Sequence, residues 1–323
     1  MRAALTALCL LMPLPALADV AEVVKGHILP GYDQLVAESG ALAELARETC
    51  ETERLAPAFH AAFDAWMGVQ HLHLGPAEDE GRSLAIVFWP DPKGLGRKAQ
   101  LALLTGDPTK FAPEAFADQS VAARGLTGLE RLLWPEAPLP ADPCPLIRAT
   151  ASDLARLAIE IRDGWTNGYA ELLLTAGAAG NTAYLSPDEA RQALFTLVVT
   201  GLEHLRDQRL GRPLGTFDRP APEKAEARAS GRSLRNVELS LLALRDMAAA
   251  LSASSPKTLS ALDRAVALAK GIDDPALAGV ATPAGRLKVE VLQQSVEAAR
   301  LAAVEELGPA LGVGLGFNAQ DGD

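Results

Sequence analysis

The feature that most constrains the fold is a helical spacing of apolar residues that returns along almost the whole chain. Between residues 55 and 70, apolar side chains recur at steps of three and four, as on the buried face of an amphipathic α-helix. The same spacing predicts helices over residues 20–46, 98–104, 120–134, 145–173, 187–205, 222–250, 256–270 and 282–307. Only residues 84–88, which suit a short strand or extended segment, and the C-terminal tail lack it. We therefore expect an all-α protein with helices long enough for bundles.

The order of these helices predicts two bundles. We place an N-terminal bundle at residues 19–140, a C-terminal bundle at residues 141–307 and a tail at residues 308–323. The segment Gly125-Leu126-x-x-Leu129 returns as Gly201-Leu202-x-x-Leu205, which is compatible with an internal duplication.

The first 18 residues predict export. Arg2 is followed by an apolar core at residues 3–15, too short to span a bilayer, and by a small-x-small cleavage signal at residues 16–18. Cys9 lies inside that core and is not expected to carry a lipid. We expect residues 1–18 to be a cleaved signal peptide and the mature protein to be periplasmic, since no later apolar run approaches the length of a transmembrane helix.

The net charge of the chain limits the kinds of partner that it can bind. The chain carries a formal net charge of −11, which argues against nucleic acid or an anionic membrane surface as a partner. A metal ion or another small ligand suits this charge better.

Two cysteines remain after removal of the signal peptide. An exported pair in an oxidising compartment predicts a disulfide between Cys50 and Cys144. Two separate buried thiols are the alternative that stays open. Cys144 lies in a proline-rich link at residues 135–145 that suits a hinge between the two halves.

The segment most suggestive of a site is residues 120–134. Gly125 and Gly128 fall inside its apolar period, and each costs about 1 kcal/mol relative to Ala within a helix, so we expect close backbone approach there. Glu130 follows on the same helix. The alternative is that another helix packs against the glycines while Glu130 pairs with Arg131 or Arg124 in solvent.

Candidate metal ligands are scattered. The five histidines form no His-Glu-x-x-His motif. His71 and His73 end the helix of residues 55–70 close to acidic residues 78–80, and His204 lies near two further acids. Coordination of a metal by Glu130 with His204 or His71 stays open beside the alternative of solvated helix faces and ends.

Several segments, taken in order, carry a resemblance to a known family. They are RSLAIVFWPD, SVAARGLTGLERLLW, RLGRPLG, EARASGRSLRN and the terminal GFNAQDGD. Together they resemble the imelysin family of exported bacterial proteins over nearly the whole mature chain. The resemblance implies two helical bundles and a Gly-x-His-x-x-Glu signature, which maps to Gly125, Thr127 and Glu130 with Thr127 at the place of the histidine.

The resemblance implies two different functions. The family takes its name from a metal-dependent, insulin-cleaving protease, whereas other members are tied to iron uptake or iron-regulated expression. Because Thr127 replaces the histidine, we expect a non-enzymatic periplasmic binding or accessory protein for iron, another divalent metal or a small ligand. Periplasmic redox or iron-uptake proteins are its expected partners. A metallopeptidase and a structural or partner-docking protein are the alternatives.

We place the expected binding site at the seam between the bundles. Glu130, Thr127 and Gly125 contribute from the central helix, and Trp89 and Asp91 form a rigid corner beside it. From the second half we expect Ser230, Arg232 and Ser233, whose hydroxyls and guanidinium suit a carboxylate or an anionic ligand, and Arg82 from the first half. A salt-bridge network that holds the bundles together is the competing interpretation of the same residues.

Overall fold

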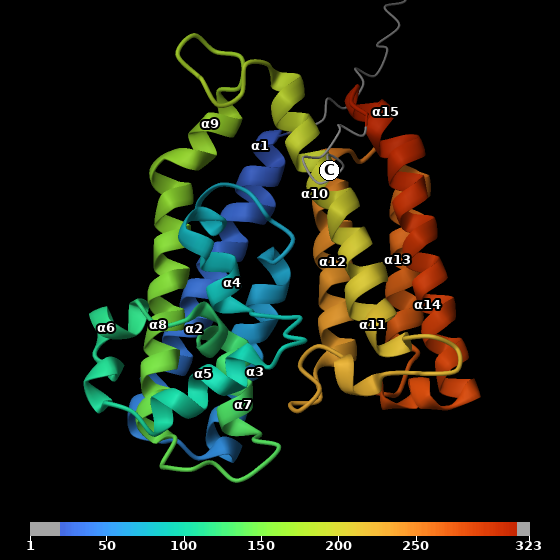
Figure 1. The fold of residues 1–323 in the computed structure, drawn as a ribbon. Helices are drawn as coiled ribbons and strands as arrows, with labels where there is room; N and C mark the ends of the chain where they lie inside the picture. Colours follow the sequence, from blue (N-terminus) through green and yellow to red (C-terminus); the bar gives the residue numbers. More distant parts are fainter. Residues whose placement is uncertain (1–19, 315–323) are drawn as a thin grey trace, which may run out of the picture.

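The computed structural model describes residues 20–314, and the regular elements among them are helices. Figure 1 shows two helical bundles standing side by side. The first contains α1 (Val20–Glu22), α2 (Leu29–Glu48), α3 (Thr52–Val69), α8 (Cys144–Gly164) and α9 (Ala170–Leu174). The second contains α10 (Pro187–His204), α12 (Ser233–Leu251), α13 (Pro256–Lys270) and α14 (Pro283–Ala302). The expected all-α fold of two bundles is confirmed.

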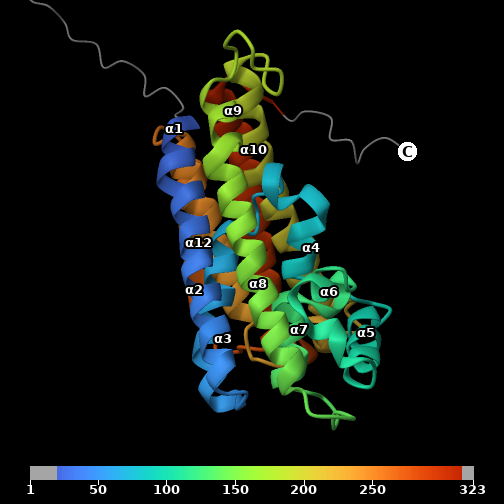
Figure 2. The same ribbon diagram turned by 90° about the vertical axis from the view of Figure 1, so that its left-hand side faces the viewer.

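Shorter helices connect and flank the bundles. Figure 2 shows four of them on one side of α8: α4 (Arg82–Ile86), α5 (Leu95–Leu104), α6 (Pro113–Ala117) and α7 (Gly125–Leu133). In the second half lie α11 (Gly211–Leu214) and α15 (Gly308–Leu311). The 3₁₀ turns are η2 (Gly75–Ala77), η3 (Asp79–Gly81), η4 (Pro108–Phe111), η5 (Val121–Ala123), η8 (Pro222–Lys224) and η9 (Ala278–Ala281).

Four π-helical turns interrupt or extend the long helices. They are η1 (Val23–Ile28), η6 (Trp165–Tyr169), η7 (Leu205–Leu210) and η10 (Ala303–Leu307). Such turns are rare and often occur at functional positions. η7 continues α10 directly, and the helix that the sequence predicts to end at residue 205 therefore runs on toward the seam.

The start of α10 follows from local chemistry. The Ser186 hydroxyl accepts a hydrogen bond from the Glu189 N–H at 3.3 Å, and Pro187 occupies the first helical position. The Glu189 carboxylate in turn accepts the Leu185 N–H at 2.6 Å. The sequence Ser-Pro-Asp-Glu at residues 186–189 is that of a capping box with proline at the first helical position, so local sequence specifies this start of the helix.

The core of the first bundle is aromatic. Trp165 is fully buried and stacks on Tyr32 with ring centres 5.9 Å apart, and Phe59 and Phe63 are buried on α3. α8 packs against α2 within this bundle.

The two bundles meet where α3 packs against α12. The chain passes from the first bundle to the second between α9 and α10 (Figure 1). The domain division at residue 140 stays a prediction.

Four local expectations need correction. The helix expected over residues 222–250 begins only at Ser233, because residues 222–224 form η8 and residues 226–231 form turns. Residues 84–88 do not form a strand, because α4 covers residues 82–86 with Ala85 and Ile86 buried, and extended backbone begins only at Val87. The helix expected over residues 120–134 begins at Gly125, after η5. The tail contains the short helix α15, while the expected signal peptide at residues 1–18 and the GFNAQDGD segment lie outside the described residues.

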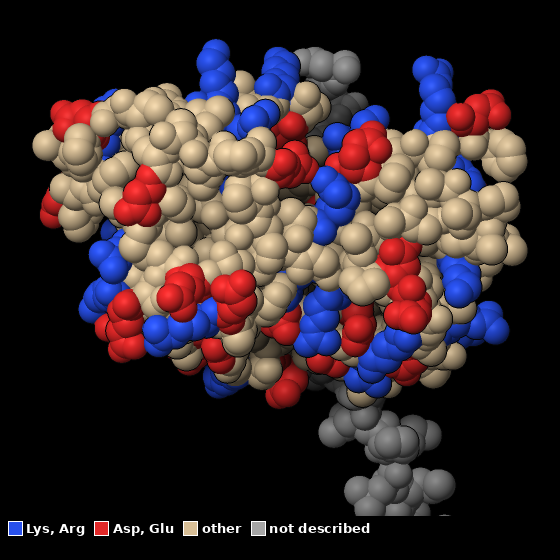
Figure 3. Space-filling view, turned by 90° about the horizontal axis from the view of Figure 1, so that it is seen from below, with Lys and Arg blue, Asp and Glu red and all other residues tan. Residues whose placement is uncertain are grey.

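Two surface properties bear on partners. None of the helices in residues 20–314 has the length and apolar character needed to cross a bilayer. On the face of the molecule seen in Figure 3, basic and acidic side chains are interspersed. That face therefore offers no basic stripe of the kind that follows a nucleic-acid backbone.

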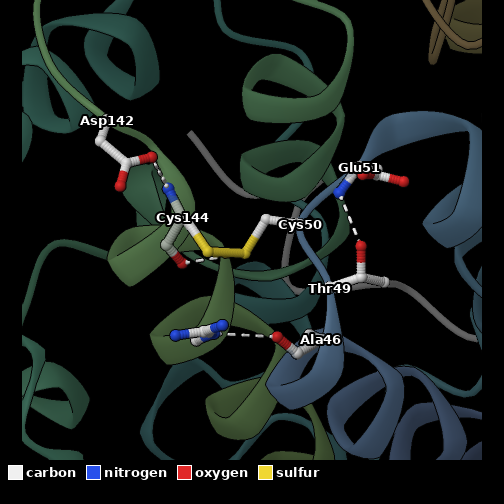
Figure 4. The surroundings of a disulfide bond; sticks show 7 residues. Ala46, Thr49, Cys50, Glu51, Asp142 and Cys144 are labelled. Carbon is white, nitrogen blue, oxygen red and sulfur yellow. Dashed lines mark hydrogen bonds between the residues drawn. A yellow bond between two sulfur atoms is a disulfide. The ribbon is translucent and has the colours of Figure 1, made fainter.

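Cys50 and Cys144 form a disulfide, as the sequence predicts. Their Cα atoms lie 5.4 Å apart, within the usual range. Figure 4 shows the bond between the end of α2 and the start of α8, where the Asp142 carboxylate accepts the Cys144 N–H at 3.0 Å. Arg148 adds a hydrogen bond to the Ala46 carbonyl at 3.1 Å. The first turn of α8 is thereby fixed to the first hairpin of the bundle.

We predict that replacing Cys50 and Cys144 by serine lowers the free energy of unfolding by about 4–5 kcal/mol, because the bond closes a long loop in the unfolded chain. The cysteines are 94 positions apart in the sequence. Urea unfolding of the exported protein, with and without reductant, measures the loss. Two free thiols in the mass spectrum of the exported protein, or equal stability of both forms, would contradict the prediction.

Candidate functional site

A cavity of about 500 Å³ lies between the short helices α5 and α7 of the first half and the loops that precede α12. One wall consists of residues 88–94 with α5, and a second of α7 with the link at residues 134–139. The third wall comes from the second half, through α11 and residues 223–229. Its volume falls in the range of small-molecule sites, which lie preferentially at such junctions.

Glu130 is the buried carboxylate on this wall. Its residue is only 8% exposed, and Oε1 accepts hydrogen bonds from the Ser230 N–H at 2.9 Å and the Ser230 hydroxyl at 2.7 Å. Burial raises the pKa of the Glu130 carboxyl above its ordinary value, although the two hydrogen bonds from Ser230 act in the opposite direction. The structure thus brings together two residues that the sequence proposed for one site.

The glycines before Glu130 explain how α7 is positioned. Gly125 has φ +64°, and a Cβ there would lie 2.1 Å from the Ala85 carbonyl oxygen, so only glycine allows this approach of α4. At Gly128 a Cβ would lie 2.5 Å from the Ala123 carbonyl oxygen. The expected close approach is present at both positions, but Gly125 begins the helix rather than lying inside it.

Thr127 faces the segment after α4. Its hydroxyl oxygen accepts the Phe88 N–H at 3.1 Å, and both residues line the cavity. Thr127 therefore serves as an anchor for the extended segment that leads to Trp89.

The solvent alternative for Glu130 is wrong. Arg124 makes a buried ion pair with Asp153, with Nε 2.8 Å from Oδ2. Arg131 donates to the Gln100 side-chain oxygen at 2.9 Å and to the Ala122 carbonyl at 2.6 Å. Neither guanidinium forms an ion pair with Glu130 in the described chain.

Trp89 and Asp91 do form a corner of the cavity. Both Asp91 carboxylate oxygens accept backbone N–H groups of α5, from Leu95 and Gly96, each at 2.8 Å. The Trp89 ring lies close to two side chains of the second half: the His204 ring centre is 6.3 Å away, and the Arg212 guanidinium carbon is 5.8 Å away. Asp91 thus fixes α5, and Trp89 provides an aromatic wall.

Five of the nine expected site residues do not line the cavity. Ser230 contacts it only through its hydrogen bonds to Glu130, Gly125 begins α7, and the other three lie elsewhere. Arg82 donates to Glu160 at 3.3 Å and to the Pro76 carbonyl at 3.1 Å, and it does not line the cavity. Arg232 and Ser233 are buried but also do not line it.

Arg232 instead fastens α12 to α3. It forms an ion pair with Asp64 and donates to the His60 carbonyl at 3.2 Å. Its guanidinium carbon lies 4.7 Å from the centre of the Phe63 ring. The salt-bridge interpretation fits this residue, whereas Ser230 holds the Glu130 carboxylate at the cavity wall.

The candidate metal ligands do not meet. His71 is buried, and its Nε2 lies 3.1 Å from Nε2 of His27. Burial lowers the pKa of His204 to about 3, so its ring is neutral at pH 7. Within residues 20–314 no group of three His, Cys, Asp or Glu side chains is placed to hold a metal ion. A bare ion held by Glu130 with His204 or His71 therefore does not fit this arrangement.

Sequence reasoning missed a buried polar network beside the cavity. Arg209, from η7, places Nε 2.7 Å from a Glu226 carboxylate oxygen and donates to the side-chain oxygen of Gln70 at 3.2 Å. Asn236 and Ser240 of α12 complete its hydrogen bonds. Although RLGRPLG and EARASGRSLRN contain most of these residues, no periodic pattern pairs a loop carboxylate with an arginine 17 positions earlier.

The fold and the cavity define an all-α protein of two bundles with a ligand-sized cavity bounded by both halves of the chain. Residues 28–302 match the family described as Imelysin, peptidase M75, so the chain belongs to the imelysin family.

Solved structures agree with this fold. An imelysin-like protein from Psychrobacter arcticum 273-4 superposes with a TM-score of 0.74 at 22% identity, covering 92% of this chain and 96% of that chain. A protein described as an iron-regulated protein A precursor, from Parabacteroides distasonis ATCC 8503, gives a TM-score of 0.68 at 13% identity, covering 88% and 92%. No curated protein matches the sequence.

We predict that Glu130→Gln stabilises the protein relative to wild type near pH 8 and that this difference disappears near pH 4. The unfolded carboxyl ionises near its ordinary pKa of 4.5, whereas the folded carboxyl keeps its proton to higher pH. Wild type therefore loses free energy of unfolding as the pH rises through this interval, and glutamine, which keeps the acceptor for Ser230, does not. Thermal melts from pH 4 to pH 8 measure the difference in stability between the variant and wild type, and Glu223→Gln is the control for loss of one charge. A Glu130→Gln variant that is less stable than wild type near pH 8 would contradict the prediction.

We predict that Arg232→Ala lowers the free energy of unfolding by about 2 kcal/mol, because it removes charged hydrogen bonds at a buried site. The matched control is Arg235→Ala. Arg235 pairs with the same Asp64, but its side chain is 48% exposed, so its loss should lower the free energy of unfolding by only about 0–1 kcal/mol. Urea unfolding measures both variants. Equal losses would show that burial of Arg232 contributes nothing special.

Proposed function

We propose that this protein is a non-enzymatic periplasmic binding or accessory protein linked to iron or metal uptake, with its ligand bound in the cavity between the bundles. The observation that carries the proposal is the cavity of about 500 Å³, which both halves of the chain enclose and which has buried Glu130 on its wall. A cavity of this size and position suits a small molecule or a metal complex.

The predicted signal peptide and one structural relative support the location and the iron link. Residues 1–18 have the pattern of a secretory leader, and the net charge of −11 suits a protein that handles cations or their complexes. One structural relative is described as an iron-regulated protein A precursor. We carry both the export and the iron link over to this chain as parts of the proposal. Periplasmic redox or iron-uptake proteins are the partners it would serve.

The chemistry around Thr127 supports a role without catalysis. A zinc peptidase of the usual kind needs imidazole ligands and a carboxylate base that face one metal. At the position of the signature histidine stands Thr127, whose hydroxyl accepts the Phe88 N–H. Glu130 has Ser230 as its hydrogen-bond partner. These contacts suit the anchoring of a cavity wall better than the activation of water.

We predict that the purified mature protein binds a metal complex without cleaving peptides, and that Trp89→Ala, which removes the aromatic wall of the cavity, weakens this binding at least tenfold. Trp89 is only partly buried, so the fold should persist. Calorimetric titration with zinc ion and with ferric citrate, beside an assay on an unfolded peptide, tests both parts.

Each alternative function gives its own result in these assays. Metal-dependent cleavage of the peptide that Glu130→Gln abolishes would favour the peptidase. Absence of binding to every probe, with a large stability loss in Glu130→Gln, would favour a structural role. Phe217→Ala, which removes an exposed aromatic side chain that does not line the cavity, is the matched control for Trp89→Ala.

A further inference from the structure

The charges on the cavity wall do not match those of the whole chain. Although the chain is acidic, the wall carries more basic than acidic side chains. The basic residues are Arg97, Arg131, Arg212, Lys224 and Arg228, and the acidic residues are Asp91, Glu130, Glu136 and Glu223. What a ligand meets depends on which of these are already paired.

The acids are largely engaged by the protein itself. Asp91 accepts two N–H groups of α5, and Glu130 accepts two hydrogen bonds from Ser230. Glu136 pairs with Arg228 at 2.6 Å. The remaining acid on the wall is Glu223, which is exposed and forms no ion pair within residues 20–314.

Three of the cations have no ion-pair or hydrogen-bond acceptor among the described residues. Throughout the described residues, Arg97, Arg212 and Lys224 have no carboxylate within ion-pair distance and donate no side-chain hydrogen bond. Arg212 is the most informative of the three, because it is half-buried and its Nε is a buried donor without a partner. An unmatched buried N–H costs free energy that an acceptor on a ligand would recover.

The positions of these groups suit an anion with an organic body. The Arg212 guanidinium lies over Trp89, 5.8 Å from the ring centre, and Trp134 and several prolines supply further apolar surface. A guanidinium binds a carboxylate through two parallel hydrogen bonds, which neither a bare cation nor a neutral molecule can accept in the same way. Three unpaired cations would also repel a free metal ion.

We propose that this cavity binds a small polycarboxylate anion through Arg212, with Arg97 and Lys224 at its entrance, and that any metal enters as the anionic complex of such a molecule. The inference rests on the proposed function, because it names the class of ligand for the same cavity. It also agrees with the lack of a three-residue ligand group among residues 20–314, since a chelator would supply the metal's ligands itself.

Citrate and ferric citrate test the proposal on the mature protein. Two of the four tryptophans, Trp89 and Trp134, line the cavity, so their fluorescence reports binding, and calorimetry gives the affinity. We expect Arg212→Gln to weaken binding of citrate and of ferric citrate at least tenfold. Arg212→Lys keeps the positive charge but not the two parallel N–H donors, so it should weaken binding less. Arg97→Gln, on the exposed side of α5, should weaken it severalfold without risk to the fold.

The matched controls are Arg219→Gln and Lys98→Gln, which remove nearby exposed charges that do not line the cavity and should leave the affinity unchanged. Binding of both probes would identify the carboxylate as the ligand, whereas binding of ferric citrate alone would identify the chelate. Unchanged affinity in Arg212→Gln, or binding of zinc ion but of neither citrate probe, would overturn the inference and leave the proposed function standing. Binding of none of the three would overturn both.

Discussion

The buried ion pair between Arg209 and Glu226 is the interaction on which the seam depends. Burial opposes ionisation of Glu226, but the adjacent Arg209 guanidinium outweighs it and keeps the pKa of the carboxyl below its usual value. Because Gln70 at the end of α3 accepts from the same guanidinium, the pair joins both bundles. Loss of either partner would leave an uncompensated charge in the interior, which costs several kcal/mol.

The cavity is a consequence of this pair. Glu226 holds the start of the loop that leads into α12, and a few residues later Ser230 reaches the carboxylate of Glu130 on α7. The same loop ends at Arg232, which is fastened to α3. The contacts of Glu226, Ser230 and Arg232 thus hold this short segment of the second half against the first half, and the cavity lies beside them.

How much the sequence could predict depends on the range of each interaction. The helical period, the Ser186 cap and the cysteine pair are local or compartment-level signals. The cap and the disulfide are present, and the period located the long helices but placed the starts of α7 and α12 too early. The left-handed conformation of Gly125 was missed, because a glycine inside an apolar period looks the same whether it lies within a helix or begins one. Arg232 was expected in the binding site or in a salt bridge between the bundles. It pairs with Asp64, which is 168 positions away, and no spacing in the sequence could name that partner.

The π-helical turn η7 has a consequence for how this seam tolerates change in length. A π-turn holds one residue more than an α-turn, and each residue of an α-helix rotates the next by about 100°. Deletion of a single residue within Leu205–Leu210 would restore the regular winding of α10 and turn the Arg209 side chain away from Glu226. The inserted residue therefore sets the angular register of the seam, and homologues that lack it would need another cation to neutralise the carboxylate.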